Sequence, residues 1–164
     1  MRLSREEISA TEGMRKVFRG SVDVAVPIER MNALGDFEDA LWRAIRAPHH
    51  LEHRVLERFD DGHRCISVVG VNGEVLEIPG EELHLSDVAS YARQQWPMGS
   101  SLVHTEHQPR GKSTRIRITM WSTDSTRAYR RQLKPGVRAL MIRLRGYYED
   151  HAVIDPGRCA VRSD

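Results

Sequence analysis

Several features that would identify a protein class are scarce in this sequence. Only two cysteines, Cys65 and Cys159, occur among 164 residues, and neither belongs to a C-x-x-C pair. They support neither a disulfide framework nor a cysteine zinc site. No apolar run approaches the about 20 residues that cross a bilayer. Residues 1–20 are rich in charge and lack the apolar stretch of a signal peptide, so we expect a cytoplasmic protein.

Lysine is almost absent, with three residues against 22 arginines, and the charge is unevenly distributed. Residues 1–109 have a net charge of −6 and residues 146–164 a net charge of −2. Residues 110–145 hold 11 basic residues and a single acidic one, Asp124, for a net charge of +10. Such asymmetry concerns binding partners rather than fold, and it favours polyanions.

The clearest local pattern is a β-hairpin. Residues 64–71 and 74–78 are two alternating runs, and Asn72-Gly73 between them suits the positive φ angles of a type I′ turn. Alternation predicts three further strands, over residues 21–28, 101–107 and 114–121.

Helical spacing and capping signals predict several helices. Ser4 and Glu7 form a capping-box pattern that opens the first. The expected helices cover residues 5–17, 32–45 with a continuation over 48–59, 87–95, and 122–133 before a break at Pro135-Gly136. Residues 137–148 fit a helix or a strand, and we favour the helix.

The order of these elements from residue 21 to 107 is strand, helix, strand, strand, helix, strand. This order is that of ferredoxin-like βαββαβ domains. We therefore expect a single α+β domain with an antiparallel sheet over residues 1–164. It would consist of an N-terminal helix (1–20), an α+β core (21–121) and a basic C-terminal helical extension (122–164).

Histidines offer two candidate metal sites. His49 and His53 are four residues apart, with Glu52 beside them, and a helix would bring them to one face. On a strand, His104 and Glu106 would share a face, to which His63 could be added. Neither set has a complete ligand group in the sequence, so we predict no metal, no cofactor and no catalytic residue.

Gly111-Lys112-Ser113 resembles the end of a phosphate-binding P-loop. The motif requires a glycine where Glu106 stands, and a helix rather than a strand after it. We reject a P-loop.

The basic segment with its aromatic residues is the remaining functional signal. Guanidinium groups neutralise phosphates, and aromatic rings stack on unpaired bases. The predicted nucleic-acid-binding residues are Arg110, Lys112, Arg115, Arg117, Trp121, Arg127, Tyr129, Arg130, Arg131, Lys134 and Arg138.

Our first hypothesis is a non-enzymatic protein that binds DNA or RNA with little sequence selectivity. The alternative is a protein-interaction module, of cellular or viral origin, in which the same surface binds an acidic protein or a second copy of the chain. A metal-dependent enzyme built on the histidines is a third, minor hypothesis.

Overall fold

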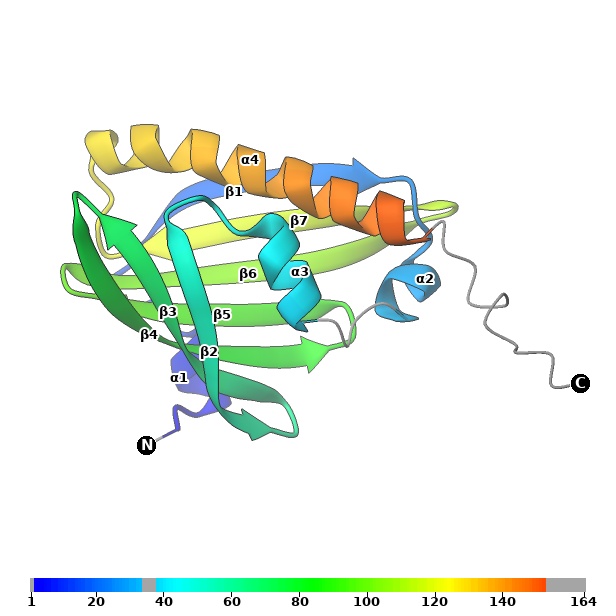
Figure 1. Ribbon diagram of the computed structural model, residues 1–164. Coiled ribbons are helices and arrows are strands. Elements are labelled where there is room, and N and C mark those ends of the chain that lie inside the picture. Colours follow the sequence, from blue (N-terminus) through cyan, green and yellow to red (C-terminus); the bar gives the residue numbers. More distant parts are fainter. Residues whose placement is uncertain (1, 34–37, 153–164) are drawn as a thin grey trace, which may run out of the picture.

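The computed structural model describes residues 2–33 and 38–152, and its centre is one antiparallel sheet of seven strands (Figure 1). The strand order is β1-β7-β6-β5-β4-β3-β2. The strands are β1 (Arg15–Val24), β2 (His50–Phe59), β3 (Gly62–Val71), β4 (Glu74–Ser86), β5 (Ala89–Trp96), β6 (Gly99–Arg110) and β7 (Ser113–Ser122). The helices are α1 (Arg5–Ser9), α2 (Ile28–Ala33), α3 (Glu38–Ile45) and α4 (Arg127–Ala152).

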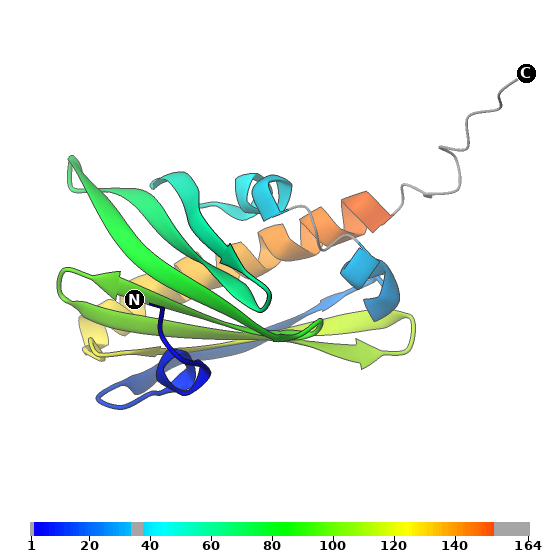
Figure 2. The same cartoon turned by 90° about the horizontal axis from the view of Figure 1, so that it is seen from below.

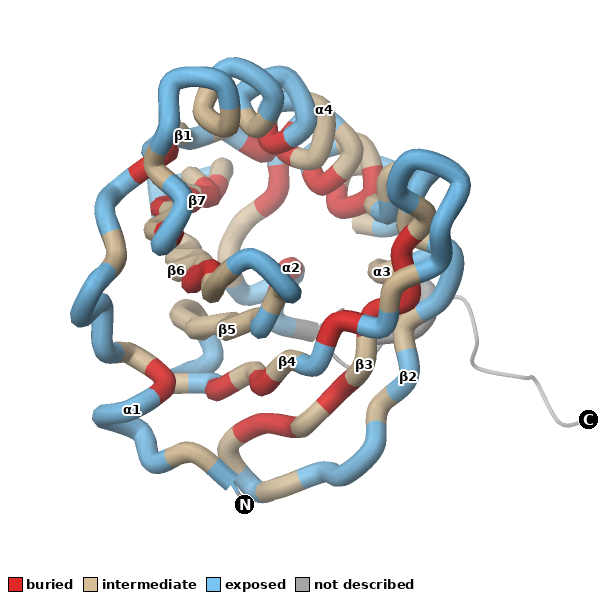
Figure 3. The backbone as a smooth tube through the Cα atoms, turned by 90° about the vertical axis from the view of Figure 1, so that its left-hand side faces the viewer, coloured by how far each residue is buried: buried red, intermediate tan, exposed pale blue. Residues whose placement is uncertain are grey.

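The sheet is strongly curved and wraps around one side of α4 (Figures 1 and 2). Seen end on, the strands run around α4 from β1 to β2, and α3 lies beside β2 (Figure 3). The side of the sheet toward α3 and α4 is called the interior face, and the other side the outer face. The short helix α1 lies against the outer face near β4 and β5.

The interior face of β1 and β7 packs tightly against α4. Thr126 caps the helix by accepting a hydrogen bond from the Tyr129 amide at 3.2 Å. Helical spacing then places apolar side chains of α4 on one stripe, where they meet apolar residues of the two strands. The buried cluster includes Phe18, Val24, Ile116, Ile118, Val137, Met141, Leu144, Tyr147 and Tyr148. Each such side chain contributes about 1.5–3 kcal/mol by leaving water, so these two strands and α4 (the packed half) anchor the fold.

Several predicted elements are confirmed. Asn72 and Gly73 have φ angles of 52° and 83°, as a type I′ turn requires, and join β3 to β4. The capping box at Ser4 is also present: its hydroxyl accepts from the Glu7 amide, and the Glu7 carboxylate accepts from the Ser4 amide at 2.7 Å. Strands β6 and β7 and a helix over residues 137–148 form as predicted.

The ferredoxin-like prediction is wrong, because two predicted helices are strands. Residues 50–59 form β2 and residues 89–96 form β5. In both, hydrogen-bonded pairing with the neighbouring strands of the sheet overrides the local helical pattern: β2 pairs with β3, and β5 with both β4 and β6. The sheet therefore has seven strands in meander order after β2, with one long C-terminal helix.

The two ends of the chain also differ from the predicted elements. The first helix stops at Ser9, and β1 begins at Arg15, so residues 15–17 are strand rather than helix. At the other end, α4 continues through Pro135 without the predicted break. Residue 20, where the predicted N-terminal helical segment ends, lies inside strand β1. That the chain is a single domain stays a prediction. No helix in the described ranges is suited to crossing a membrane.

Candidate functional site

Strand β3 carries a row of polar side chains on the interior face. Alternation along the strand places His63, Cys65 and Ser67 on one side, and all three are buried. His53 of β2 lies opposite Ser67 and stacks on Trp42 of α3, with ring centroids 5.7 Å apart. Because α3 covers this face, the row points to the interior.

Around this row lies a group of titratable side chains that we call the histidine cluster: His53, His63, His84, Cys65 and Glu82. The His63 ring lies 5.9 Å from the His53 ring and 6.4 Å from the His84 ring, centroid to centroid. A Glu82 carboxylate oxygen lies 3.9 Å from Nε2 of His63, and the other oxygen lies 3.7 Å from Nε2 of His84. Strands β2, β3 and β4 thus bring five groups together that are spread over more than 30 residues.

A second polar pair lies farther along the interior face. His107 of β6 meets Tyr148 of α4 edge to face, with ring centroids 6.1 Å apart. Burial lowers the pKa of His107, so its imidazole is neutral at pH 7. Burial, with a smaller contribution from Tyr147, raises the pKa of Tyr148 to about 12, so this phenol keeps its proton. Among the described residues, Nδ1 of His107 is buried without a hydrogen-bond partner.

The interior face is packed less tightly on β5 and β6 than on β1 and β7. Phe18 and Val24 on β1 and Ile116 and Ile118 on β7 are at most 8% exposed. Ser101 on the interior face of β6 is buried. The other interior side chains of β5 and β6 keep partial access to solvent, although the sheet curls around them: Ser90, Ala92, Gln94, Trp96, Val103, Thr105 and His107. We call strands β2 to β6 the polar half.

The two histidine pairs considered as candidate metal sites in the sequence, His49 with His53 and His104 with Glu106, are placed differently from what each site would need. His53 is on a strand, so helical spacing does not join it to His49; the His49 ring contacts His50 instead, at 4.5 Å. His104 and Glu106 do share a face, but it is the outer one. There His104 stacks on Tyr91 at 4.4 Å, on the side opposite His63.

The structure divides the predicted nucleic-acid-binding residues between the two sides of the sheet. Arg115, Arg117 and Trp121 project from the outer face of β7, where Arg115 binds Asp23 through two hydrogen bonds of 2.7 and 2.8 Å and Arg117 lies 3.8 Å from Glu106. Arg110 and Lys112 are exposed around the β6–β7 turn. The others are on α4, across the sheet: Arg127, Tyr129, Arg130, Arg131, Lys134 and Arg138. They form no single surface.

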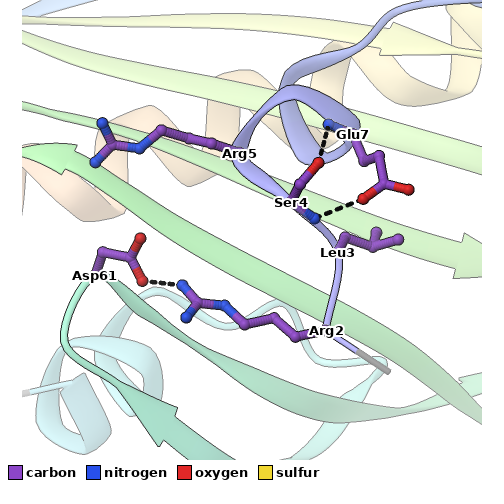
Figure 4. Close-up of a pocket in the computed structure, with 6 residues that line it drawn as sticks. All are labelled: Arg2, Leu3, Ser4, Arg5, Glu7 and Asp61. Carbon is purple, nitrogen blue, oxygen red and sulfur yellow. Dashed lines mark hydrogen bonds and ion pairs between the residues drawn. The ribbon is translucent and has the colours of Figure 1, made fainter.

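A recess at the surface near the N-terminus is lined by Arg2, Leu3, Ser4, Arg5, Glu7 and Asp61 (Figure 4). Arg2 is paired with Asp61 between β2 and β3, which links the residues before α1 to the sheet, and the Glu7 carboxylate accepts from the Ser4 amide as part of the cap of α1.

No protein-family profile matches the sequence, and no curated protein does. Solved structures do share the fold. The aromatase/cyclase Zhui from Streptomyces sp. R1128 has a TM-score of 0.65 at 17% identity, covering 84% of this chain and 95% of that one. A START superfamily protein from Mycobacterium smegmatis has a TM-score of 0.63 at 15% identity, with coverages of 84% and 98%.

The di-domain aromatase/cyclase StfQ, from the steffimycin biosynthetic pathway, has a TM-score of 0.69 at 14% identity. The match covers 88% of this chain and 54% of StfQ, so the chain spans about half of that protein. The seven-stranded sheet with its long C-terminal helix is the helix-grip fold of these proteins.

The shared fold corrects the predicted function. Nucleic-acid binding, RNA-binding included, is wrong, because the chain has the fold of aromatase/cyclases and a START superfamily protein, and because its basic residues are divided by the sheet. The predicted partners, nucleic acid and an acidic protein or second copy, are withdrawn with it.

Sequence reasoning missed the histidine cluster for one identifiable reason. His63-x-Cys65-x-Ser67 is a polar row with strand periodicity, and it adjoins a hairpin that was predicted correctly. His53 was assigned to a helix, so its position beside this row was not visible. If residues 50–59 had been read as a strand preceding the predicted hairpin of residues 64–78, His53 would have been placed beside His63, Cys65 and Ser67.

Proposed function

We propose that this protein binds a small organic molecule between α4 and the interior face of the polar half. The observation that carries the proposal is His107. Its Nδ1 atom is buried and has no hydrogen-bond partner among the described residues, on a face whose neighbouring side chains remain partly accessible. Buried polar atoms are nearly always paired, so a polar group of a bound molecule is the partner that we infer.

The side chains around His107 define the chemistry of the ligand. The neutral imidazole accepts or donates one hydrogen bond, and the protonated Tyr148 phenol is a donor and acceptor. Ile116 of β7 lies opposite His107, and Val103 and Ala92 offer apolar contact farther along the same face. An aromatic ring system with one or a few hydroxyl or carbonyl groups fits this combination.

The fold neighbours support the same class of ligand. Two of them are named aromatase/cyclases, one from a biosynthetic pathway, and such activities concern small ring compounds. The identities of 14% and 17% restrict this support to the fold. The proposal is therefore that the protein binds a small organic molecule, and it includes no reaction.

The test compares two probes that differ by one hydroxyl, 2-naphthol and naphthalene, by calorimetric titration. We expect the protein to bind 2-naphthol about five- to tenfold more tightly, because one hydrogen bond to His107 contributes about 1 kcal/mol. His107→Gln should remove most of this preference. The matched control is His104→Gln on the outer face, which should keep it.

NMR of the histidine rings locates the probe. The signals of His107 should shift on addition of 2-naphthol, and those of His104 should not. Failure of both probes to bind, or an unchanged preference in His107→Gln, would contradict the proposal.

A further inference from the structure

We infer that the histidine cluster is a transition-metal site in which His53, His63 and Cys65 bind Zn²⁺. One ligand atom from each of the three residues lies within 4.8 Å of the other two. The three residues come from two adjacent, paired strands. His53 of β2 lies opposite Ser67 of β3, which places His53 beside the row that holds His63 and Cys65.

The separation of these atoms suits a zinc ion after small side-chain rotations. With Zn–N bonds near 2.0 Å and Zn–S bonds near 2.3 Å, tetrahedral ligands lie about 3.5 Å apart. The three atoms therefore need to approach by about 1 Å, which χ rotations of two imidazoles and one thiol can provide. The backbone is fixed by the β2–β3 ladder and does not have to move.

The surroundings favour a cation. His63 and Cys65 are buried, and His53 is partly covered by Trp42. The Glu82 carboxylate, 3.9 Å from Nε2 of His63, adds negative charge beside the site. In zinc proteins a carboxylate commonly holds a ligating imidazole in the required tautomer and orientation, and Glu82 is placed for that role.

The donor set selects the metal. Two imidazole nitrogens and one thiolate match Zn²⁺, whereas Mg²⁺ and Ca²⁺ prefer oxygen ligands. Binding converts the Cys65 thiol to a thiolate and releases its proton to solvent. Three protein ligands leave a fourth position that faces the interior, where water or the polar group of a small molecule can bind. The inference does not depend on the proposed function, because the metal needs no organic ligand.

Cobalt provides the direct test, because Co²⁺ replaces Zn²⁺ in tetrahedral sites and is coloured. We would titrate untagged protein carrying Cys159→Ser, so that Cys65 is the remaining thiol. We expect one Co²⁺ per chain, the visible bands of tetrahedral Co²⁺, and a near-ultraviolet thiolate-to-cobalt band. Zn²⁺ should displace the cobalt and abolish all of these bands.

Variants identify the ligands. Cys65→Ser should lose the thiolate band, and His53→Gln and His63→Gln should lose tight binding. Glu82→Gln should lower the affinity for the metal about 10- to 100-fold, as is typical when a carboxylate that orients a ligating histidine is removed. His104→Gln is the matched control, since His104 stacks on Tyr91 on the outer face, and it should bind as the parent does.

A measurement on protein with an intact histidine cluster tests the site even if some of the cluster variants fail to fold. ¹¹³Cd²⁺ bound to the Cys159→Ser protein should give one NMR resonance in the range of mixed nitrogen and sulfur ligation. A shift in the all-oxygen range, no stoichiometric metal, or a thiolate band that survives Cys65→Ser would overturn the site. The naphthol titration is done on metal-free protein, so its failure and the failure of this site remain distinct results.

Discussion

The packed half and the polar half present opposite chemistry to the same interior. In the packed half, apolar side chains of β1 and β7 pack against α4; Phe18, Val24, Ile116 and Ile118 are almost inaccessible, and Val22 and Met120 are partly buried. In the polar half, histidines, a cysteine, a glutamate and hydroxyl groups face the interior, and many neighbours remain partly exposed. One sheet thus separates the residues that stabilise the fold from those available for binding, so each set can be changed alone.

The largest expected loss of stability comes from a substitution in the packed half. Ile118→Ala should lower the free energy of unfolding by about 2–4 kcal/mol, because it leaves a cavity in close-packed surroundings. Thr105→Ala, on the interior face of β6 two strands from the sheet edge, should cost less than about 1 kcal/mol. Chemical denaturation of both variants measures the difference. Equal losses would show that the two halves are packed alike.

A glycine next to the histidine cluster tests the backbone of the polar half. A Cβ atom added at Gly62 would lie 2.0 Å from the carbonyl oxygen of Glu82, a backbone atom that cannot move without disturbing the β3–β4 ladder. Gly62→Ala should therefore cost about 1–3 kcal/mol. By contrast, Gly73→Ala meets no atom within 4 Å, and its cost should come only from the φ of 83°.

The denaturation midpoint of Gly62→Ala should fall below that of Gly73→Ala. The reverse order would mean that β3 and β4 can shift apart near His63, and that the polar half is loose in its backbone as well as in its side chains.

The smallest expected effect is a pH dependence from the polar half. The pKa of His107 is lowered from 6.5 by burial, so the unfolded chain takes up a proton at a higher pH than the folded chain does. Stability should therefore fall as the pH drops below about 6.5. His107→Gln should reduce that fall, measured as the denaturation midpoint at pH 7.5 and pH 5.5. His104→Gln serves as the control, and an equal reduction there would contradict the assignment to His107.

Local signals in the sequence predicted parts of this architecture well. Asn72-Gly73 fixed the β3–β4 hairpin, the Ser4 capping box opened α1, and clean alternation gave β7. These features depend on residues close in sequence. The spacing of Leu51, Val55 and Phe59 indicated a helix, but in the structure it is incidental to an edge strand, in which Leu51 is exposed.

The candidate site could be predicted only in fragments. His63 and His53 were each noticed, but their meeting depends on the pairing of β2 with β3, which the assignment of residues 48–59 to a helix concealed. The charge of residues 110–145 was real and was misinterpreted, because charge along a chain does not show which side of a sheet each residue occupies. Arg115 illustrates this: its guanidinium is bound to Asp23, which is 92 residues away.

The pairing of β1 with β7 has a consequence for how the chain folds. Asp23 lies opposite Arg115, so the first strand in the sequence depends on the last. Strands β2 to β7 can pair as successive hairpins while the chain is being synthesised, but β1 has no neighbouring strand until residue 122 has emerged. Contacts of this sequence separation slow folding. The step that closes the sheet, and brings Phe18 and Val24 under α4, is therefore expected to be the last and slowest.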